Sequence, residues 1–187
     1  MSGSTRPSKR TPPLTVSRPE LLINSSDRDF RALVHGMLAF SARLEAVRTG
    51  FAGIIGLTGI QYTILISVSH LEHSGDVSVT MIAAHLHISG AFVTIETGKL
   101  LKLGLVTKRP DPKDRRRVCL SITRKGAELL QRLAPTQAQV NDVLFEFLDA
   151  QQFRQFRALV DRMTDCGDRS VALLQYLAGQ PAAKGLS

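Results

Sequence analysis

The sequence predicts a mainly α-helical fold with a small β-wing, in which a winged helix-turn-helix is joined to a helical dimerisation region. Three observations predict it: helical periodicity over most of the chain, two short helices separated by a tight turn, and a basic hairpin directly after them. The hairpin spans residues 103–126, LGLVTKRPDPKDRRRVCLSITRKG, with short apolar strands on either side of a proline-bearing tip. So many cations on one loop tip add nothing to a core, but they match a polyanion such as nucleic acid.

Composition is compatible with an anionic partner, and it argues against a single-strand-binding protein and against a membrane protein. The 187 residues carry 24 Lys and Arg against 16 Asp and Glu, a formal net charge of +8. Aromatic residues make up only 5% of the chain and Trp is absent, which disfavours an aromatic stacking platform for single strands. The sequence has no apolar run of about 18 residues and no apolar signal core at its start. We therefore expect a cytoplasmic, nucleoid-associated protein with no membrane partner.

Composition and periodicity divide the chain into five expected segments. The first 19 residues contain prolines and basic residues but no acid, so they are either a solvated tail or an arm that adds phosphate contacts. In order, the segments are a basic, largely disordered N-terminal arm (1–26), an N-terminal dimerisation helix and loop (27–56), a winged helix-turn-helix lobe (57–123), C-terminal dimerisation helices (124–178) and a flexible tail (179–187).

The first two helices follow from apolar spacing and one cap. Apolar residues from Asp27 onward recur every three or four positions, which predicts one amphipathic helix to about Arg48. Three glycines in residues 49–56 then predict a loop or a broken turn. Thr58 and Gln61 have the spacing of a capping box that opens the second helix.

Capping residues also place the helix-turn-helix and the wing. Ser78 caps a short helix that ends at Leu86, and Ser89 caps a second helix that ends at Gly104. The tight turn between them lies at His87 and the residue after it. After the wing tip, the alternating apolar residues Val118, Leu120 and Ile122 predict a half-buried strand.

The C-terminal region is expected to be helical and to need a partner. Thr123 caps a helix that we expect to be interrupted and bent near Pro135, because a proline inside a helix removes a hydrogen bond. Asp149 and Gln152 resemble a second capping box before the last helix. The apolar stripes of these helices exceed what a small winged domain can cover, and the simplest partner is a second copy of the chain.

Several short motifs carry a resemblance to a known family. The most specific are Leu100, Gly104-Leu105-Val106, Asp111-Pro112, Asp114-Arg115-Arg116, Ile122-Thr123 and Gly126. With the order of elements, they make residues 27–178 resemble the MarR (multiple antibiotic resistance regulator) family of winged helix-turn-helix regulators. The resemblance implies a homodimer that binds double-stranded DNA at a pseudo-palindromic operator, with recognition helices in major grooves and wing arginines in minor grooves.

The resemblance also implies a function and its regulation. We expect a sequence-specific transcriptional regulator with no cofactor and no enzymatic activity. A repressor is the first expectation, and such proteins include activators as well. A small anionic effector, aromatic or an acyl-coenzyme A thioester, is expected to lower its DNA affinity. The sequence lacks the glycine-rich phosphate loop, the nucleophile elbow and the metal-ligand motifs that an enzyme of those kinds would need.

The resemblance assigns DNA contacts residue by residue. Arg116 matches the wing-tip arginine and Asp114 the acid that orients it, and a guanidinium suits the negative potential of a narrow minor groove. The recognition helix is poor in base readers: Ile95 stands where the family often has a basic residue, and the first two turns have no Arg. Glu96 is either a buried acid that needs an Arg partner or a residue at the edge. The expected DNA-binding set is Thr80, Ser89, Ala91, Thr94, Lys99, Arg109, Lys113, Asp114, Arg115 and Arg116.

The effector site and the mode of sensing leave alternatives open. His35, Arg43 and Tyr62, from the first two helices, are candidates for the wall of an effector pocket, although packing or solvation also explains them. A metal-responsive regulator would use the histidines, and a redox-responsive one Cys119 or Cys166. No metal site is assigned, because no cysteine or dense carboxylate cluster accompanies the histidines. An architectural DNA-binding protein without an effector and a protein–protein adaptor are the remaining alternatives.

Overall fold

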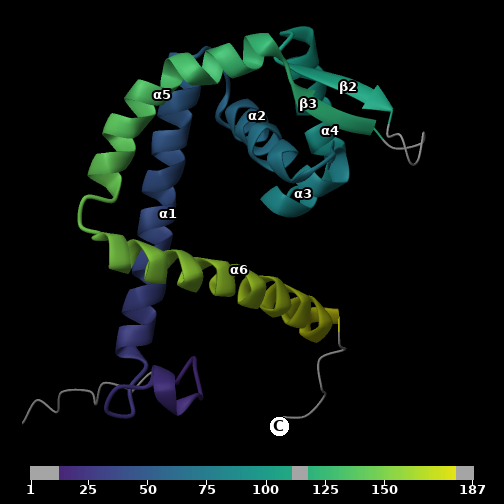
Figure 1. Ribbon diagram of the computed structural model, residues 1–187. Coiled ribbons are helices and arrows are strands. Elements are labelled where there is room, and N and C mark those ends of the chain that lie inside the picture. The colour runs from purple at the N-terminus through teal and green to yellow at the C-terminus, as the bar shows by residue number, and fades with distance from the viewer. Residues whose placement is uncertain (1–12, 111–117, 180–187) are drawn as a thin grey trace, which may run out of the picture. The chain divides into compact units, whose positions relative to one another are not determined.

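The computed structural model describes residues 13–110 and 118–179 (Figure 1). The chain divides at Pro135 into two compact units, residues 1–135 and 136–187. Before the division, the elements are η1 (Pro19–Leu21), α1 (Arg28–Ile54), α2 (Gly59–Leu71), η2 (Glu72–Ser74), β1 (Val77–Ser78), α3 (Val79–Leu86), α4 (Gly90–Lys102), β2 (Val106–Pro110) and β3 (Val118–Ile122). Helix α5 (Arg124–Leu144) crosses the division, and α6 (Ala150–Gly179) lies in the second unit. The predicted fold class is confirmed.

The residues before α1 are held by one carboxylate. Asp27 is 5% exposed, and its Oδ2 accepts hydrogen bonds from the backbone N–H of Thr15 at 2.8 Å and from the Thr15 hydroxyl at 2.7 Å. Arg31 Nε donates to the same oxygen at 3.0 Å, and Arg31 Nη2 donates to the Pro13 carbonyl at 2.7 Å. The hydrogen bonds from Arg31 and Thr15 hold the pKa of Asp27 well below its ordinary value. Residues 13–26, part of the expected arm, are therefore attached to the start of α1.

Helix α1 runs to Ile54, past its predicted end, so the expected loop over residues 49–56 is wrong for most of its length. Phe51 and Ala52 are 5% and 0% exposed, and their burial outweighs the cost of about 1 kcal/mol for each glycine in a helix. The turn after the helix contains Gly56, which has a φ of +71°. The next N–H bonds back to the Ala52 carbonyl at 2.9 Å, as in a Schellman cap.

Helix α2 is the centre of the core. The predicted capping box is confirmed: Thr58 N–H donates to Gln61 Oε1 at 3.2 Å, and Gln61 N–H donates to the Thr58 hydroxyl at 3.3 Å. Ile64, Leu65 and Val68 on this helix are all 0% exposed. The helix contacts α1, α3, α4 and β3, so it fixes the other helices of the first unit.

The helix-turn-helix forms as the sequence predicts. The hydroxyls of Ser78 and Ser89 each accept the backbone N–H three residues later at 3.2 Å, which caps α3 and α4. His87 makes the turn between them in a left-handed conformation, with a φ of 52°. Gly104 ends α4 with a φ of 69°, a conformation that glycine adopts without strain.

The wing forms a three-stranded antiparallel sheet in the order β1-β3-β2. In the register of β2 and β3, Val106 pairs with Ile122 and Pro110 with Val118. The predicted alternation holds only in part, because Val118 at the tip end is 40% exposed whereas Leu120 is 1% exposed. Cys119 is buried instead, since β3 is the central strand and pairs here with β1 as well as β2.

The start of α5 is locked to the turn between α4 and β2. The Thr123 hydroxyl accepts the N–H of Gly126 at 3.0 Å, which confirms the predicted cap, and donates to the Gly104 carbonyl at 2.7 Å. A Cβ on Gly126 would lie 2.3 Å from the Leu105 carbonyl oxygen, so only glycine fits at this position.

Helices α5 and α6 differ from the prediction at one point. Helix α5 continues through Pro135, so the expected interruption is wrong, and the bend there stays a prediction. The carbonyl of Gln131 that loses its helical partner lies on an exposed residue, where water can solvate it. The second capping box is confirmed: Asp149 Oδ1 accepts the N–H of Gln152 at 2.8 Å, and Gln152 Oε1 accepts the N–H of Asp149 at 2.9 Å.

Within residues 13–110 and 118–179, no single helix is long and apolar enough to cross a membrane. Two helix pairs, α1 with α2 and α3 with α4, reach that length and composition only when joined across bends of 88° and 115°.

Candidate nucleic-acid interface

The expected DNA contacts that the structure describes are all exposed and belong to one lobe. They are Thr80 on α3, Ser89 at the cap of α4, Ala91, Thr94 and Lys99 on α4, and Arg109 on β2. Figure 1 shows α3, α4 and the two wing strands grouped together at one end of the first unit. Lys113, Asp114, Arg115 and Arg116 lie outside the described residues. The lobe therefore presents the recognition helix and the strands that lead to the basic tip.

Helix α4 has a buried face and an exposed face. The buried residues are Val93, Glu96, Thr97 and Leu100. This spacing of three and four places them on one side of the helix. Residues on the opposite side are exposed: Ala91, Phe92, Thr94 and Ile95. The helix is thus anchored in the core by one side and free to meet a partner with the other.

Glu96 joins the recognition helix to α2. It is 5% exposed, and its carboxylate accepts hydrogen bonds from Gln61 Nε2 at 3.2 Å and from Lys99 Nζ at 2.7 Å. Glu96 is thus a buried acid, but its partners are Gln61 and Lys99 instead of an arginine. The Lys99 side chain stays 54% exposed, so its ammonium lies at the surface beside a buried negative charge. Sequence reasoning placed Gln61 only in the capping box, where its Oε1 accepts a hydrogen bond, and missed that its Nε2 donates to Glu96.

Arg109 forms an ion pair with Asp76, in the loop before β1. The two side chains are 48% and 43% exposed, and an exposed pair of this kind contributes little stability. Glu72 Oε2 accepts the Ile122 N–H at 3.1 Å from the same side of the sheet. These two contacts connect the strands of the wing to the segment between α2 and β1.

A small cavity of about 220 Å³ lies where α1 and α2 meet the helix-turn-helix. Its lining residues are Glu45, Arg48, Ile60, Thr63, Leu86 and Ile88. Arg48 donates a hydrogen bond to the Thr63 hydroxyl, and its Nη1 lies 3.4 Å from Glu45 Oε2. Thr63 in turn donates to the Gly59 carbonyl at 2.8 Å. The cavity thus has apolar walls from Ile60, Leu86 and Ile88, and its polar groups are the Arg48 guanidinium, the Glu45 carboxylate and the Thr63 hydroxyl.

The three residues proposed from the sequence for an effector pocket do not line this cavity. His35 and Arg43 are exposed on α1, and Arg43 Nη1 donates to the Ala39 carbonyl at 2.8 Å. Tyr62 is 2% exposed and packs edge-on against Phe51, with ring centroids 6.2 Å apart. Burial raises the pKa of Tyr62. The cation that lines the cavity is Arg48. The sequence indicated only that Arg48 lies at the end of the predicted first helix.

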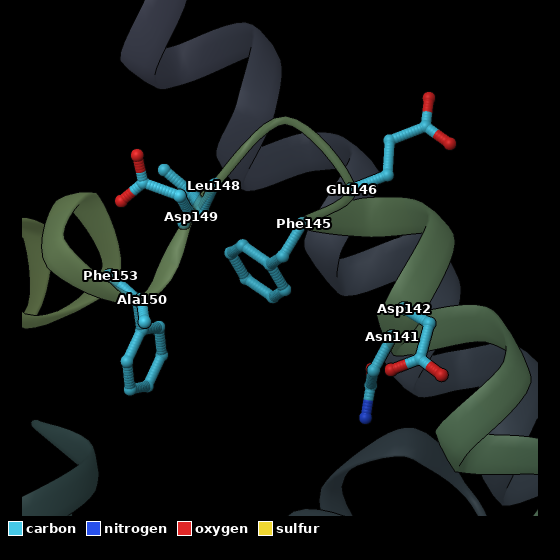
Figure 2. A pocket seen from close by; sticks show the side chains of 8 residues that line it. All are labelled: Asn141, Asp142, Phe145, Glu146, Leu148, Asp149, Ala150 and Phe153. Carbon is cyan, nitrogen blue, oxygen red and sulfur yellow. The ribbon is translucent and has the colours of Figure 1, made fainter.

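A larger hollow of about 470 Å³ lies at the turn between α5 and α6 in the second unit (Figure 2). The rings of Phe145 and Phe153 face the same open space, whereas the Glu146 carboxylate points away from it. Asp142 and Asp149 add further negative charge at the rim. This combination of aromatic rings and carboxylates suits an apolar surface with basic neighbours and does not suit an anion.

The cysteines and histidines are the candidates for metal or redox sensing. Among the described residues no group of three or more His, Cys, Asp or Glu could hold a metal ion. His73 Nδ1, in η2, lies 2.7 Å from the Ser69 carbonyl of the preceding helix α2. Cys119 is 1% exposed, whereas Cys166 is exposed and its Sγ accepts a hydrogen bond from Arg169 Nη2 at 3.1 Å.

The contact between α2 and the recognition helix can be tested by stability. Glu96→Ala is expected to lower the free energy of unfolding by about 1–3 kcal/mol, because the buried Gln61 amide loses its acceptor. Lys99→Ala, the matched control, is expected to cost less than about 1 kcal/mol, because water can replace a half-exposed ammonium. Urea unfolding followed by circular dichroism without DNA measures both. An equal or larger loss in Lys99→Ala would show that the surface ion pair, and not the buried amide contact, holds the helix.

Comparisons with known proteins agree with this fold. Residues 55–117 match the family model described as MarR family. An uncharacterised HTH-type transcriptional regulator of Bacillus subtilis (strain 168), YhbI, is 29% identical over 118 residues, which cover 61% of this chain and 75% of that protein. A mutant MarR of E. coli, solved in complex with operator DNA, superimposes with a TM-score of 0.59 at 16% identity and covers 72% of this chain and 95% of its own.

A second solved structure is BpsR of Bordetella bronchiseptica, whose DNA binding is described as regulated by 6-hydroxynicotinic acid. It has a TM-score of 0.57 at 24% identity and covers 70% of this chain and 91% of its own. Fold, family match and relatives agree: residues 55–117 match the MarR family model, and the chain has the fold of the MarR structures to which it is similar.

Proposed function

We propose that the protein is a sequence-specific repressor that binds double-stranded DNA as a homodimer and is released by a small anionic effector. The observation that carries the proposal is the lobe itself: a recognition helix with an exposed outer face, beside wing strands that lead to the basic segment DPKDRRR. The operator complex of the E. coli relative supports the partner, and the BpsR description supports regulation by a small acid. Such a repressor would act in the cytoplasm, on nucleoid DNA.

The DNA interaction combines groove contacts with charge. Thr80, Ser89, Ala91, Thr94 and Lys99 would lie at the major groove, and the wing would lie along the flanking minor groove. Each cation that neutralises a phosphate releases a counterion, so the affinity should fall steeply with salt. Two recognition helices of a dimer must lie about 34 Å apart to meet successive major grooves of a pseudo-palindrome. Arg109, Lys113 and Arg115 would add phosphate contacts around Arg116.

The wing tip supplies the sharpest test of DNA binding. Arg116→Ala should weaken specific binding by about 1–3 kcal/mol, the size of one good groove contact. Asp114→Ala should weaken it too, because the carboxylate orients the guanidinium even though its removal makes the protein more basic. Arg132→Ala, at an exposed position on α5, removes the same charge as Arg116→Ala and is the control for charge alone. Fluorescence anisotropy with a duplex selected from random sequence measures all three; tighter binding by Asp114→Ala would contradict the orienting role.

The homodimer rests on apolar surface that one copy leaves in water. No residue of α6 is buried, although it carries Phe153, Phe156, Val160, Met163 and Leu174. On α1, the residues Leu33, Val34, Met37 and Leu38 are between 38% and 63% exposed. Exposed apolar helix faces mark interaction sites, and the hollow with Phe145 and Phe153 adds apolar surface at the start of α6 (Figure 2). We infer a permanent dimer that buries more than about 2,000 Å² through α1, α5 and α6.

Sedimentation tests the dimer directly. The wild-type protein should sediment as a dimer at micromolar concentration, and Phe156→Asp should dissociate or unfold it, because a buried charge at an apolar contact is costly. Gln151→Asp, at a polar exposed position on the same helix, adds the same charge and should leave the dimer intact. A folded wild-type monomer at that concentration would rule out this proposal.

The effector is proposed to bind in the cavity with Arg48. Its volume of about 220 Å³ is below the roughly 300–1,000 Å³ typical of drug-sized ligands, which favours a small aromatic carboxylate over an acyl-coenzyme A thioester. An anion bound to Arg48 would compete with Glu45 and with the Thr63 hydroxyl. Thr63 belongs to the first turns of α2, from which Gln61 reaches Glu96 on the recognition helix. The cavity is therefore connected to the DNA-binding face by direct contacts.

Calorimetry with a panel of hydroxybenzoates, with and without operator duplex, tests the effector site. A true inducer should bind the free dimer more tightly than the DNA-bound dimer, by about 1–3 kcal/mol of coupling. Arg48→Gln should abolish this ligand response and keep the DNA affinity, whereas Arg43→Gln should keep both. Equal ligand affinity for free and DNA-bound protein rules out that ligand, and a response lost in Arg43→Gln but kept in Arg48→Gln would place the site elsewhere on α1.

A further inference from the structure

The outward face of the recognition helix is apolar. Phe92 and Ile95 are 41% and 58% exposed, and their spacing of three residues places them side by side on α4. Ala91 and Thr94 are exposed beside them. Large apolar side chains at the centre of an exposed helix face are unfavourable in water unless a partner covers them.

The side chains of Ser89, Thr94 and Lys99 are already engaged within the protein. The Ser89 hydroxyl accepts the Phe92 N–H at 3.2 Å as the helix cap. The Thr94 hydroxyl donates to the Gly90 carbonyl at 2.8 Å, and Lys99 Nζ is bound to Glu96 at 2.7 Å. The outer face therefore offers methyl groups and a ring edge, with few free donors for base edges.

This surface matches one chemical group of the major groove. Reading guanine there needs Arg or Lys, and reading adenine needs Asn or Gln, whereas the C5-methyl of thymine is contacted by apolar side chains. Residues 90–97, GAFVTIET, contain none of those four polar types. The chemistry of the helix thus favours thymine over the other bases.

Charge around the apolar face indicates that DNA is its occupant. Lys99 and Lys102 lie in the last turns of the same helix, and Lys108 and Arg109 lie on the adjoining strand β2. An apolar patch flanked by cations suits thymine methyls flanked by phosphates. A second copy of the chain would bring the same cations face to face and would be repelled.

We propose that α4 reads thymine methyl groups through Ile95 and Phe92, so that each operator half-site carries thymines at the base pairs these side chains face. The proposal rests on the DNA binding proposed above. It predicts specificity that depends on a methyl group instead of a hydrogen bond.

Chemically modified duplexes test the proposal. The wild-type dimer selects its operator from random 30-bp duplexes, and the selected duplex is then made with deoxyuridine in place of thymidine, one half-site position at a time. Deoxyuridine pairs like thymidine and lacks only the methyl group. At the contacted positions, loss of the methyl should weaken binding about fourfold, the equivalent of about 0.8 kcal/mol for one buried methylene-sized group.

Protein variants identify the side chain that contacts the methyl. Ile95→Ala should weaken binding of the thymine duplex and should no longer distinguish thymine from uracil at the position it faces. Its high exposure means that the fold should be kept, and circular dichroism checks this. Leu103→Ala, at the 44% exposed C-cap of the same helix, should keep the full thymine preference.

The outcomes separate this inference from the proposed function. Equal affinity for thymine and uracil at every half-site position, with tight binding of the selected duplex, would overturn methyl readout and leave DNA binding intact. An undiminished thymine preference in both Ile95→Ala and Phe92→Ala would also overturn the assignment. Failure to select any duplex would instead overturn the proposed function, and self-association through this face, relieved by Ile95→Ala, would show that a second copy is the occupant.

Discussion

Burial of α2 is the constraint on which the rest of the first unit depends. Ile64, Leu65 and Val68 are inaccessible to water, and each such side chain contributes roughly 1.5–3 kcal/mol relative to exposure. Once these three are buried, the rotation of α2 is fixed and its first turn must place Gln61 toward the recognition helix and Thr63 toward α1. Apolar packing thus decides where the polar contacts of the regulator lie, and a shift of this one helix would move both of them.

Features that depend on neighbouring residues could be predicted from the sequence. The caps at Thr58, Ser78 and Ser89 and the end of α4 at Gly104 were predicted because a cap needs only residues three or four positions away. The end of α1 could not be predicted this way. It is set by the burial of Phe51 against Tyr62 on the next helix, beyond the three or four positions that a cap involves, and that packing overrides the preference of glycines for loops.

In the candidate site, too, local features could be predicted from the sequence and long-range contacts could not. The order of the elements and the charge of the wing predicted the winged helix-turn-helix lobe. They did not predict which residues each side chain contacts. Arg43 and Arg48 are both arginines on one helix, and only the packing of α1 on α2 determines that Arg48 lines the cavity. Glu96 was ambiguous for the same reason, because the amide that satisfies it lies 35 residues away in the sequence. A single sequence does not show which residues far apart in the chain contact each other in the fold.

The close approach of Gly126 to the Leu105 carbonyl has a consequence for how such a protein can evolve. Every missense change at this codon adds a Cβ where backbone already lies, 2.3 Å away, so the position is closed to neutral drift. The exposed face of α4 and the lining of the cavity have no comparable restriction, because their side chains end in solvent or in open space. If the proposed function holds, operator and effector can therefore diverge between descendants, while a single glycine at the start of α5 persists as a mark of the shared architecture.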